Sequence, residues 1–381
     1  MTLFALVPLA IWIYLLLGRG FFWLMRERDT GTNSSERFSG WPSVTAIVPA
    51  RDEADVVERT LKSLFAQDYP GQFRVVLVDD QSTDGTAEAA GRAANACDEG
   101  GRFTLVRGTP RPQGWTGKVW AMHQGFLCAD DNAAPDFLLF TDADIAHAPD
   151  NLRNLVLWAE SANLVLASLM AKLHCRSLPE RLLVPAFVFF FAMLYPFGWA
   201  NDPAYATAAA AGGCMLVRRN ALRSAGGLET ISDAIIDDCA LARVLKRQGR
   251  TWLGLSNRAC SIRPYSGFGE IGQMVSRSAY AQLHYSPAVL CGTLIGMIVV
   301  YAVPPFLAFF SAGTAKIESV LAWLLMAGAY QPILRFYRVS PLWGVALPLI
   351  GAIYSFFTLN SAIEYWRGRG GMWKGRAQAI A

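Results

Sequence analysis

The segment from Phe137 to His147 constrains the fold of this chain more than any other. It begins with four apolar residues, Phe137 to Phe140, a pattern typical of a strand buried on both faces of a sheet. Asp142 and Asp144 follow at the carboxyl end of this predicted strand, where open α/β sheets bind their ligands. Two neighbouring carboxylates are costly to bury and repel each other. Either they form an ordinary acidic turn, or they hold a divalent cation, Mg²⁺ or Mn²⁺, that carries a diphosphate.

Other segments repeat the plan of a strand that ends in polar residues and leads into a helix. The predicted strands are Val44–Val48, Val75–Val78, Phe103–Gly108 and Phe137–Phe140, and the predicted helices are Asp55–Phe65, a helix from Thr86, and Lys118–Ala129. Pro49 is expected to stop the first strand, and Asp79 and Asp80 end the second. Alternating strands and helices predict a parallel sheet with right-handed crossovers. The acidic residues that follow its strands should therefore gather along one edge.

A second acidic pair lies farther along the chain. Cys214–Val217 is predicted to be another strand, and Asp237 and Asp238 open an amphipathic helix that ends near Gly249. The dipole of a helix favours carboxylates at its start, so simple capping accounts for this pair without a catalytic role.

The overall composition predicts a soluble domain joined to membrane segments. With 53% hydrophobic residues and a mean hydropathy of +0.27 the chain is too apolar for a purely soluble enzyme, and with 17% charged residues it is too polar for membrane helices alone. A net charge of +4 does not argue for a nucleic-acid partner, although it suits a protein beside an anionic leaflet. The seven cysteines are scattered without metal-type spacing, which favours reduced thiols facing a cytosol.

Membrane segments are predicted near both ends. Leu3–Met25 is long enough to span a bilayer as an uncleaved anchor, and Arg26 and Arg28 place its end in the cytoplasm. Three more apolar runs are Ala288–Phe310, Val320–Leu334 and Leu342–Leu359. Three full crossings would leave the basic tail outside, against the positive-inside rule, so we expect a cytosolic C-terminus. Pro304-Pro305 interrupts the first of these runs, which leaves both a clean span and a re-entrant hairpin open there.

The segment Leu178–Trp199 is more aromatic than a surface helix should be. It can be a core helix, a spanning helix, or an interfacial helix lying among the lipid headgroups. We favour the interfacial placement, because the residues on both sides of it must return to one active site.

Five motifs occur in an order that resembles family 2 glycosyltransferases, which have the GT-A fold. They are VPARDE, LFAQDYP, VDDQSTDG, GWTGKVWAMHQG and TDAD, and the resemblance covers most of Val44–Gly249. The N-terminal anchor, GWTGK and the ending YWRGRGGMWKGR together look most like the hopene-associated glycosyltransferases. Ceramide glucosyltransferase is a more distant look-alike.

The resemblance implies roles for individual residues. Asp238 matches the catalytic base, and Asp142 and Asp144 match the residues that hold Mg²⁺ or Mn²⁺. The implied donor-binding residues are Pro49, Arg51, Glu53, Asp79, Asp80, Lys118 and Asp142. Weaker matches to an acceptor site are Gly213, Arg277 and Gln282.

These observations predict an α/β GT-A domain with a mostly parallel sheet and transmembrane helices at both ends. The expected divisions are an anchor at 1–28, a cytosolic domain at 41–285 with an interfacial segment at 178–200, and a membrane region with a basic tail at 286–381. The expected protein is a multi-pass enzyme of the cytoplasmic membrane that inverts the sugar as it moves it from a nucleotide-sugar donor, a UDP-sugar, to a lipid, a hopanoid or related isoprenoid.

Several alternatives stay open. A polyprenyl phosphate or a sphingolipid-type lipid can replace the hopanoid as acceptor. A processive polysaccharide synthase is disfavoured by the poor acceptor motif and the few spans. A non-catalytic membrane scaffold or a lipid transporter belongs to a different class of protein. The intact acids argue against a scaffold, and the few spans argue against a transporter.

Overall fold

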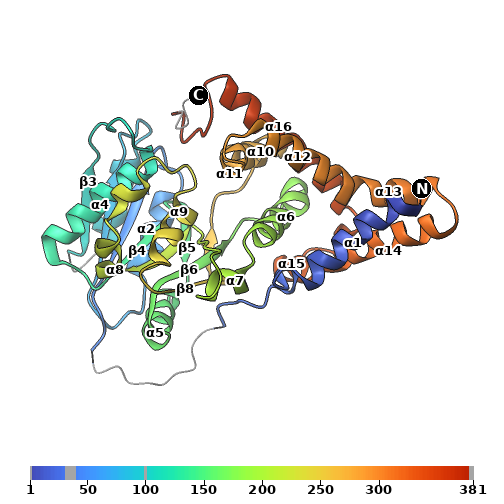
Figure 1. The fold of residues 1–381 in the computed structure, drawn as a ribbon. Helices are drawn as coiled ribbons and strands as arrows, with labels where there is room; N and C mark the ends of the chain where they lie inside the picture. Colours follow the sequence, from blue (N-terminus) through green and yellow to red (C-terminus); the bar gives the residue numbers. More distant parts are fainter. Residues whose placement is uncertain (1, 31–39, 98–100, 377–381) are drawn as a thin grey trace.

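The computed structural model describes residues 2–30, 40–97 and 101–376. Within them one eight-stranded sheet lies beside a group of helices drawn from both ends of the chain (Figure 1). The strands are β1 (Val44–Ala50), β2 (Phe73–Asp79), β3 (Phe103–Arg107), β4 (Phe137–Thr141), β5 (Ile145–His147), β6 (Leu164–Lys172), β7 (Cys214–Arg218) and β8 (Arg250–Ser261). Their order in the sheet is β3-β2-β1-β4-β7-β6-β8-β5.

The sheet is mixed, with more parallel than antiparallel pairs. β1 pairs in parallel with β2 and β4, β2 with β3, and β6 with β8. β7 runs antiparallel between β4 and β6, and β5 runs antiparallel to β8. The predicted α/β class is confirmed. Because β1, β2 and β4 run in the same direction, the polar segments that follow them lie at the same edge.

Helices cover both faces of the sheet. One face is buried under α2 (Val57–Phe65), α3 (Thr86–Cys97) and α5 (Asn151–Ser161), and the other under α4 (Gly117–Ala133), α8 (Arg219–Ser224) and α9 (Asp237–Leu245). The spacing of apolar residues explains the arrangement. In α2, Leu61 and Leu64 point into the core, whereas Glu58 and Lys62 form an exposed ion pair at 2.6 Å.

Pro49 does not stop the first strand, contrary to the prediction. β1 continues through it to Ala50, with Pro49 opposite Val78 in the register with β2. Amide groups along a strand alternate in direction, and that of Val44 donates toward β2, to Gln72. The nitrogen of Pro49 therefore faces the side of β4, where pairing already ends at Ile47. No ladder bond is lost, so the proline is tolerated.

The N-terminal helix is shorter than the predicted span of Leu3–Met25. α1 (Thr2–Leu17) has 16 residues, about 24 Å at 1.5 Å per residue, against a hydrocarbon core of about 30 Å. Gly20 and Phe21 then adopt left-handed backbone conformations that end the helix. The chain continues in a short 3₁₀ turn, where Phe22 packs on Phe189 with ring centroids 5.3 Å apart.

The aromatic segment forms α6 (Leu178–Leu194) and α7 (Phe197–Asn201). Most apolar side chains of α6 are buried against other helices of this chain. Tyr354 donates a hydrogen bond to the backbone oxygen of Leu183 at 2.8 Å, which ties α6 to α16 (Leu347–Trp366). This packing is what the core-helix interpretation expects, and the interfacial location stays a prediction.

The run that contains Pro304-Pro305 is one continuous helical path and not a hairpin, the other possibility that the sequence left open. It consists of α12 (Pro287–Met297), a π-helical turn (Ile298–Ala302) and α13 (Val303–Phe310). Pro304 has no N–H to give to the oxygen of Val300. The indole of Trp12 in α1 donates to that oxygen instead, at 3.1 Å.

The C-terminal helices form an arm with α1. α14 (Gly313–Ala329) packs against α1 and α13, and these three helices project away from the sheet (Figure 1). α15 (Gln331–Tyr337) leads back toward the sheet, where Lys172 binds the backbone oxygen of Phe336 at 3.2 Å. α16 then runs back along α12 and past α10 (Phe268–Ser276), so the tail that follows it reaches the sheet again.

Candidate active site

Acidic and basic side chains lie next to one another at the ends of β1 and β2. Arg51 donates to the backbone oxygen of Asp80, and its Nη1 lies 3.7 Å from the carboxylate of the same residue. Asp80 is fully buried, and burial raises the pKa of its carboxyl although Arg376 and Arg51 oppose the rise. Asp79 accepts the N–H of Ser82 at 3.1 Å and so fixes the turn after β2. The predicted donor residues Pro49, Arg51, Glu53, Asp79 and Asp80 thus lie together.

Lys118 connects the two acidic pairs of the sequence. It is the second residue of α4, and its Nζ lies 2.9 Å from Asp142 Oδ1 and 3.2 Å from Asp237 Oδ2. Burial alone would lower the pKa of Lys118, but the carboxylates of Asp142 and Asp237 outweigh it and raise the pKa. The Lys118 ammonium therefore stays protonated, and it lies between the end of β4 and the start of α9. Asp237 is an ion-pair partner and does more than cap its helix.

Asp238 lies beside this cluster and remains partly accessible. Its Oδ2 accepts the N–H of Gly212 at 2.9 Å, and its Oδ1 accepts the N–H of Cys239 at 2.7 Å. Burial and the neighbouring Asp237 raise the pKa of Asp238 to about 6, against the opposing charge of Lys118. A carboxylate with such a pKa is ionised at neutral pH and is a stronger base than an ordinary one.

Gly212 was missed by the sequence reasoning and has a clear steric role. A Cβ atom there would lie 3.0 Å from Lys118 Nζ and 3.5 Å from Asp238 Oδ2. A side chain at position 212 would therefore press on the end of Lys118, whereas glycine leaves room for the ammonium in its present position. The Gly-Gly pair in the sequence was the available signal, but the resemblance pointed to the neighbouring Gly213 as an acceptor residue.

Asp142 and Asp144 lie where the sequence placed them, directly after β4. Burial and the charge of Asp142 raise the pKa of Asp144 to about 6. Arg263 Nε lies 3.4 Å from Asp144, and Arg263 also pairs with Glu53. The donor set fits a hard divalent cation, because two neighbouring carboxylates supply the oxygen ligands that such an ion prefers, and a cation would relieve the repulsion by which Asp142 raises the pKa of Asp144. Among the described residues no group of three or more His, Cys, Asp or Glu side chains is placed to hold a metal, so the protein would supply two carboxylates.

The three residues matched weakly to an acceptor site are not brought together. Gly213 is packed within 3.2 Å of Ala171, measured from the position of a Cβ, and its backbone oxygen accepts from Thr141 at 2.8 Å. Gln282 accepts a hydrogen bond from Tyr195 at 2.8 Å. Arg277 alone lines a small cavity together with Lys118 and Asp237. Their acceptor role stays a prediction.

The C-terminal tail reaches this site, which the sequence reasoning did not foresee. Lys374 Nζ lies 2.8 Å from Glu53 Oε1 and 3.0 Å from the backbone oxygen of Asp52. Arg376 binds Asp80 at 3.1 Å and Gln81 at 2.7 Å. The sequence offered only a basic, glycine-rich ending, which predicted the side of the membrane but no partner in the fold.

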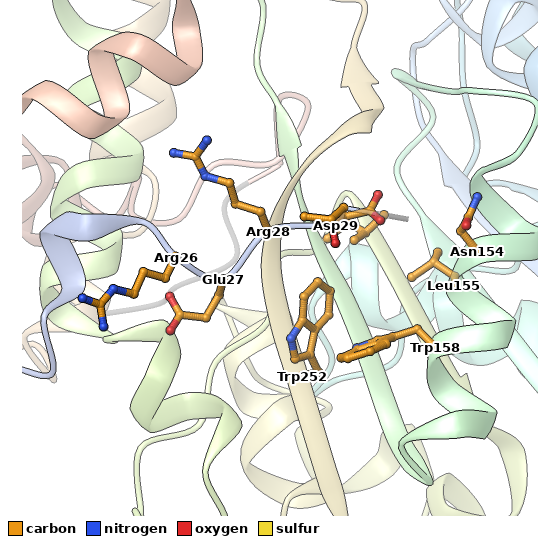
Figure 2. Close-up of a pocket in the computed structure, with 10 residues that line it drawn as sticks. Arg26, Glu27, Arg28, Asp29, Asn154, Leu155, Trp158 and Trp252 are labelled. Carbon is orange, nitrogen blue, oxygen red and sulfur yellow. The ribbon is translucent and has the colours of Figure 1, made fainter. Parts of the chain in front are cut away.

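A larger cavity lies away from the acidic edge. It has a volume of about 230 Å³ and is formed by the segment after α1 together with α5 and β8 (Figure 2). Trp158 and Trp252 line it side by side, with ring centroids 5.7 Å apart, and Arg26 and Glu27 line it from the segment after α1. It contains none of the predicted site residues.

The mixed, mostly parallel sheet with helices on both faces is a GT-A-like α/β fold. Residues 45–226 match the family model described as Glycosyl transferase family 2. A mannosyltransferase from Pyrobaculum calidifontis, solved with GDP-Man and Mn²⁺, has the same fold, with a TM-score of 0.57, 20% identity, and coverage of 95% of this chain and 98% of that one.

Two curated relatives share part of the sequence. An N-acetylglucosaminyltransferase of Rhizobium leguminosarum bv. viciae is 36% identical over 30% of this chain and 24% of its own length. Another of Sinorhizobium fredii is 32% identical over 30% of this chain and 26% of its own length. The chain therefore aligns with about a quarter of the length of these relatives. The resemblance to hopene-associated enzymes stays a prediction.

Proposed function

We propose that the protein is a membrane-attached, inverting glycosyltransferase that moves a sugar from a UDP-sugar to a hydroxyl group of a lipid. The observation that carries the proposal is the position of Asp238, a partly accessible carboxylate next to the cluster of Lys118, Asp142 and Asp237. The match of residues 45–226 to the family 2 glycosyltransferase model supports transfer from a nucleotide sugar.

The donor is proposed to lie along the acidic edge. The turn after β1, with Pro49, Arg51 and Glu53, and the pair Asp79 and Asp80 would hold the nucleoside. Lys118 would face the diphosphate or the ribose. Asp142 and Asp144 would hold Mg²⁺ or Mn²⁺. Such an ion stabilises the negative charge that develops on a leaving nucleoside diphosphate.

Asp238 is proposed to act as the general base. It would accept the proton of the acceptor hydroxyl as the oxygen of that group forms a bond to the anomeric carbon and the bond to the diphosphate breaks. The backbone amides of Gly212 and Cys239 fix the orientation of the carboxylate. A single displacement with one base and no covalent intermediate inverts the configuration of the sugar.

The apolar helices support a lipid acceptor and attachment to a membrane. Two helical paths, Pro287–Phe310 and Gly313–Tyr337, are long and apolar enough to cross a bilayer. Large apolar side chains remain exposed on them, among them Phe309 at 70% and Phe310 at 75%. A hopanoid or related isoprenoid is proposed as the acceptor from the sequence resemblance alone.

The path of the chain supports a tail on the catalytic side of the membrane. The two long helical paths run out along the arm and back. α16 begins partway along the arm, because Val345, just before it, accepts a hydrogen bond at 3.2 Å from Trp323 in the middle of α14. The run after Leu342 would then be the segment that does not cross completely. Such a topology would agree with the positive-inside rule and would keep the catalytic domain and the tail in the cytosol.

The test uses the full-length protein in detergent. UDP-sugars are offered with Mn²⁺ and with lipid extracts from cells that contain or lack the protein, and lipids are analysed by mass spectrometry. A lipid that gains the mass of a hexose or of N-acetylhexosamine only with the intact protein supports the proposal. Turnover with soluble sugars and no lipid product would contradict the lipid acceptor.

A further inference from the structure

The last described residues of the chain form a small hairpin that covers the acidic edge. Trp373 and Arg376 exchange two backbone hydrogen bonds, at 2.9 and 3.0 Å. Lys374 and Gly375 between them both have positive φ angles, 46° and 78°, as a two-residue turn of type I′ requires. The turn therefore places Lys374 at its tip, directed toward Glu53.

The hairpin is fixed at a second point, closer to β2. Arg376 pairs with Asp80 and Gln81, and Arg51 donates to the backbone oxygen of Lys374 at 3.3 Å. The tail thus extends from Glu53, which shares Arg263 with Asp144, to the buried Asp80. The tail therefore lies between Asp144, proposed to hold the metal, and Asp80, proposed to hold the nucleoside.

The polar groups at this contact are not fully satisfied. A lysine ammonium has three N–H donors, and Lys374 uses two of them, on Glu53 and on the backbone oxygen of Asp52. Its side chain keeps 26% of its surface exposed. On the other side, Asp80 Oδ1 is buried without a hydrogen-bond partner among the described residues. A further polar group is needed here to complete the hydrogen bonding.

The tail also changes the charge that a ligand meets. Without it, Glu53 would keep Arg263 and Asp80 would keep Arg51 as ion-pair partners among the described residues. An edge this rich in carboxylates repels an anionic diphosphate. Lys374 and Arg376 bring two positive charges to it, and Trp373 with Gly371 closes the small cavity next to Lys118 and Asp237.

We propose that residues 371–376 of the tail form a wall of the donor site in which Lys374 binds a diphosphate oxygen of the donor while Arg376 anchors the hairpin on Asp80. This inference rests on the proposed function, because it takes the ligand of the edge to be a nucleoside diphosphate. The spare N–H of Lys374 meets the phosphate, and the pair with Glu53 holds the ammonium in place.

The test is calorimetric titration of the full-length protein in detergent with UDP and, separately, GDP, each with Mn²⁺. The variant is Lys374→Asn, because asparagine tolerates the left-handed backbone of the turn and removes the charge. The matched control is Arg369→Asn. Arg369 lies in the same tail but pairs with Glu364, away from the acidic edge. Thermal unfolding of both variants checks that the fold is retained.

Lys374→Asn is expected to weaken binding of the nucleoside diphosphate by roughly 10- to 100-fold, the usual worth of a charge-assisted hydrogen bond, with Arg369→Asn unchanged. Equal binding by Lys374→Asn and the parent would overturn the role of Lys374. Tighter binding would overturn it too, since the tail would then be a plug that competes with the donor. If the parent binds neither nucleotide, the proposed function fails and this inference fails with it.

Discussion

Replacing Asp238 by Asn is expected to slow sugar transfer and leave donor binding nearly intact. The carboxylate accepts backbone N–H groups from Gly212 and Cys239. An amide has the same shape, and its oxygen can still accept one of these bonds, so the loop before β7 and the nearby Lys118 should keep their places. The amide cannot take a proton from an acceptor hydroxyl, however, and the chemical step loses its base.

The expected magnitude follows from the role and the surroundings of this group. A general base contributes on the order of 10²–10⁴-fold to a rate, and its effect is greatest when its pKa lies near the working pH. Because burial and Asp237 raise the pKa of Asp238 to about 6, we expect a loss of about 10³-fold. The ionised form is the active one, so transfer by the parent should slow as the pH falls below about 6. Asp238→Asn should lack that dependence.

The assay is single-turnover transfer at saturating UDP-sugar, with UDP titration measured in parallel. Asp237→Asn is the matched control, since it removes the adjacent charge but leaves the contact with Gly212. Asp237 pairs with Lys118 at 3.2 Å, so this variant should alter donor affinity more than the transfer step. A slow Asp237→Asn beside a normal Asp238→Asn would move the base one residue earlier. Normal transfer in both would refute a protein base and indicate an acceptor that arrives ionised, such as a polyprenyl phosphate.

Three further predictions concern the metal, the stability and the membrane. Asp144→Asn should abolish turnover and weaken UDP binding mainly when Mn²⁺ is present; an equal effect of Mn²⁺ on variant and parent would remove Asp144 from the metal site. Glu180 is buried, and although burial alone would raise its pKa, the N–H groups of Tyr265, Ser177 and Arg176 and the ring of His174 lower it to about 2. Its stabilisation is therefore complete above the ordinary pKa of 4.5 and is lost as the pH falls toward 2, a change of about 3 kcal/mol; melting in detergent should show a smaller acid-induced loss for Glu180→Gln than for the parent. Finally, three single-cysteine variants, made in a background without the native cysteines, are treated in intact cells with an impermeant thiol reagent. The reagent should label Ser311→Cys, at the bend between α13 and α14, but not Asn201→Cys or Asp202→Cys. Labelling of either of the last two would mean that the aromatic segment spans the membrane.

The strands and the acidic edge could be predicted from local sequence. Four apolar residues before Asp142 have to be buried, and β4 is indeed buried along its whole length. Parallel strands end on the same side, so Glu53, Asp79 and Asp142 had to meet at one edge once β1, β2 and β4 were recognised. Asp237 and Asp238 at the start of a helix were equally visible in the sequence.

Other features depended on contacts between segments far apart in the chain. Composition alone could not tell a membrane-facing α6 from a buried one, because both are apolar and the contacts of α6 with α16 come from a segment far along the chain. The tolerance of Pro304 depends on Trp12, which lies in a different helix.

What the sequence determined by itself is the α/β domain and its carboxylate edge, because periodicity and burial are properties of neighbouring residues. What only the tertiary structure decided is how that edge is completed: Arg263 joins Glu53 to Asp144, and Lys374 and Arg376 arrive from the other end of the chain. The physical reason is that a charge is satisfied by proximity in space, and no local pattern records which distant cation will pair with a given carboxylate.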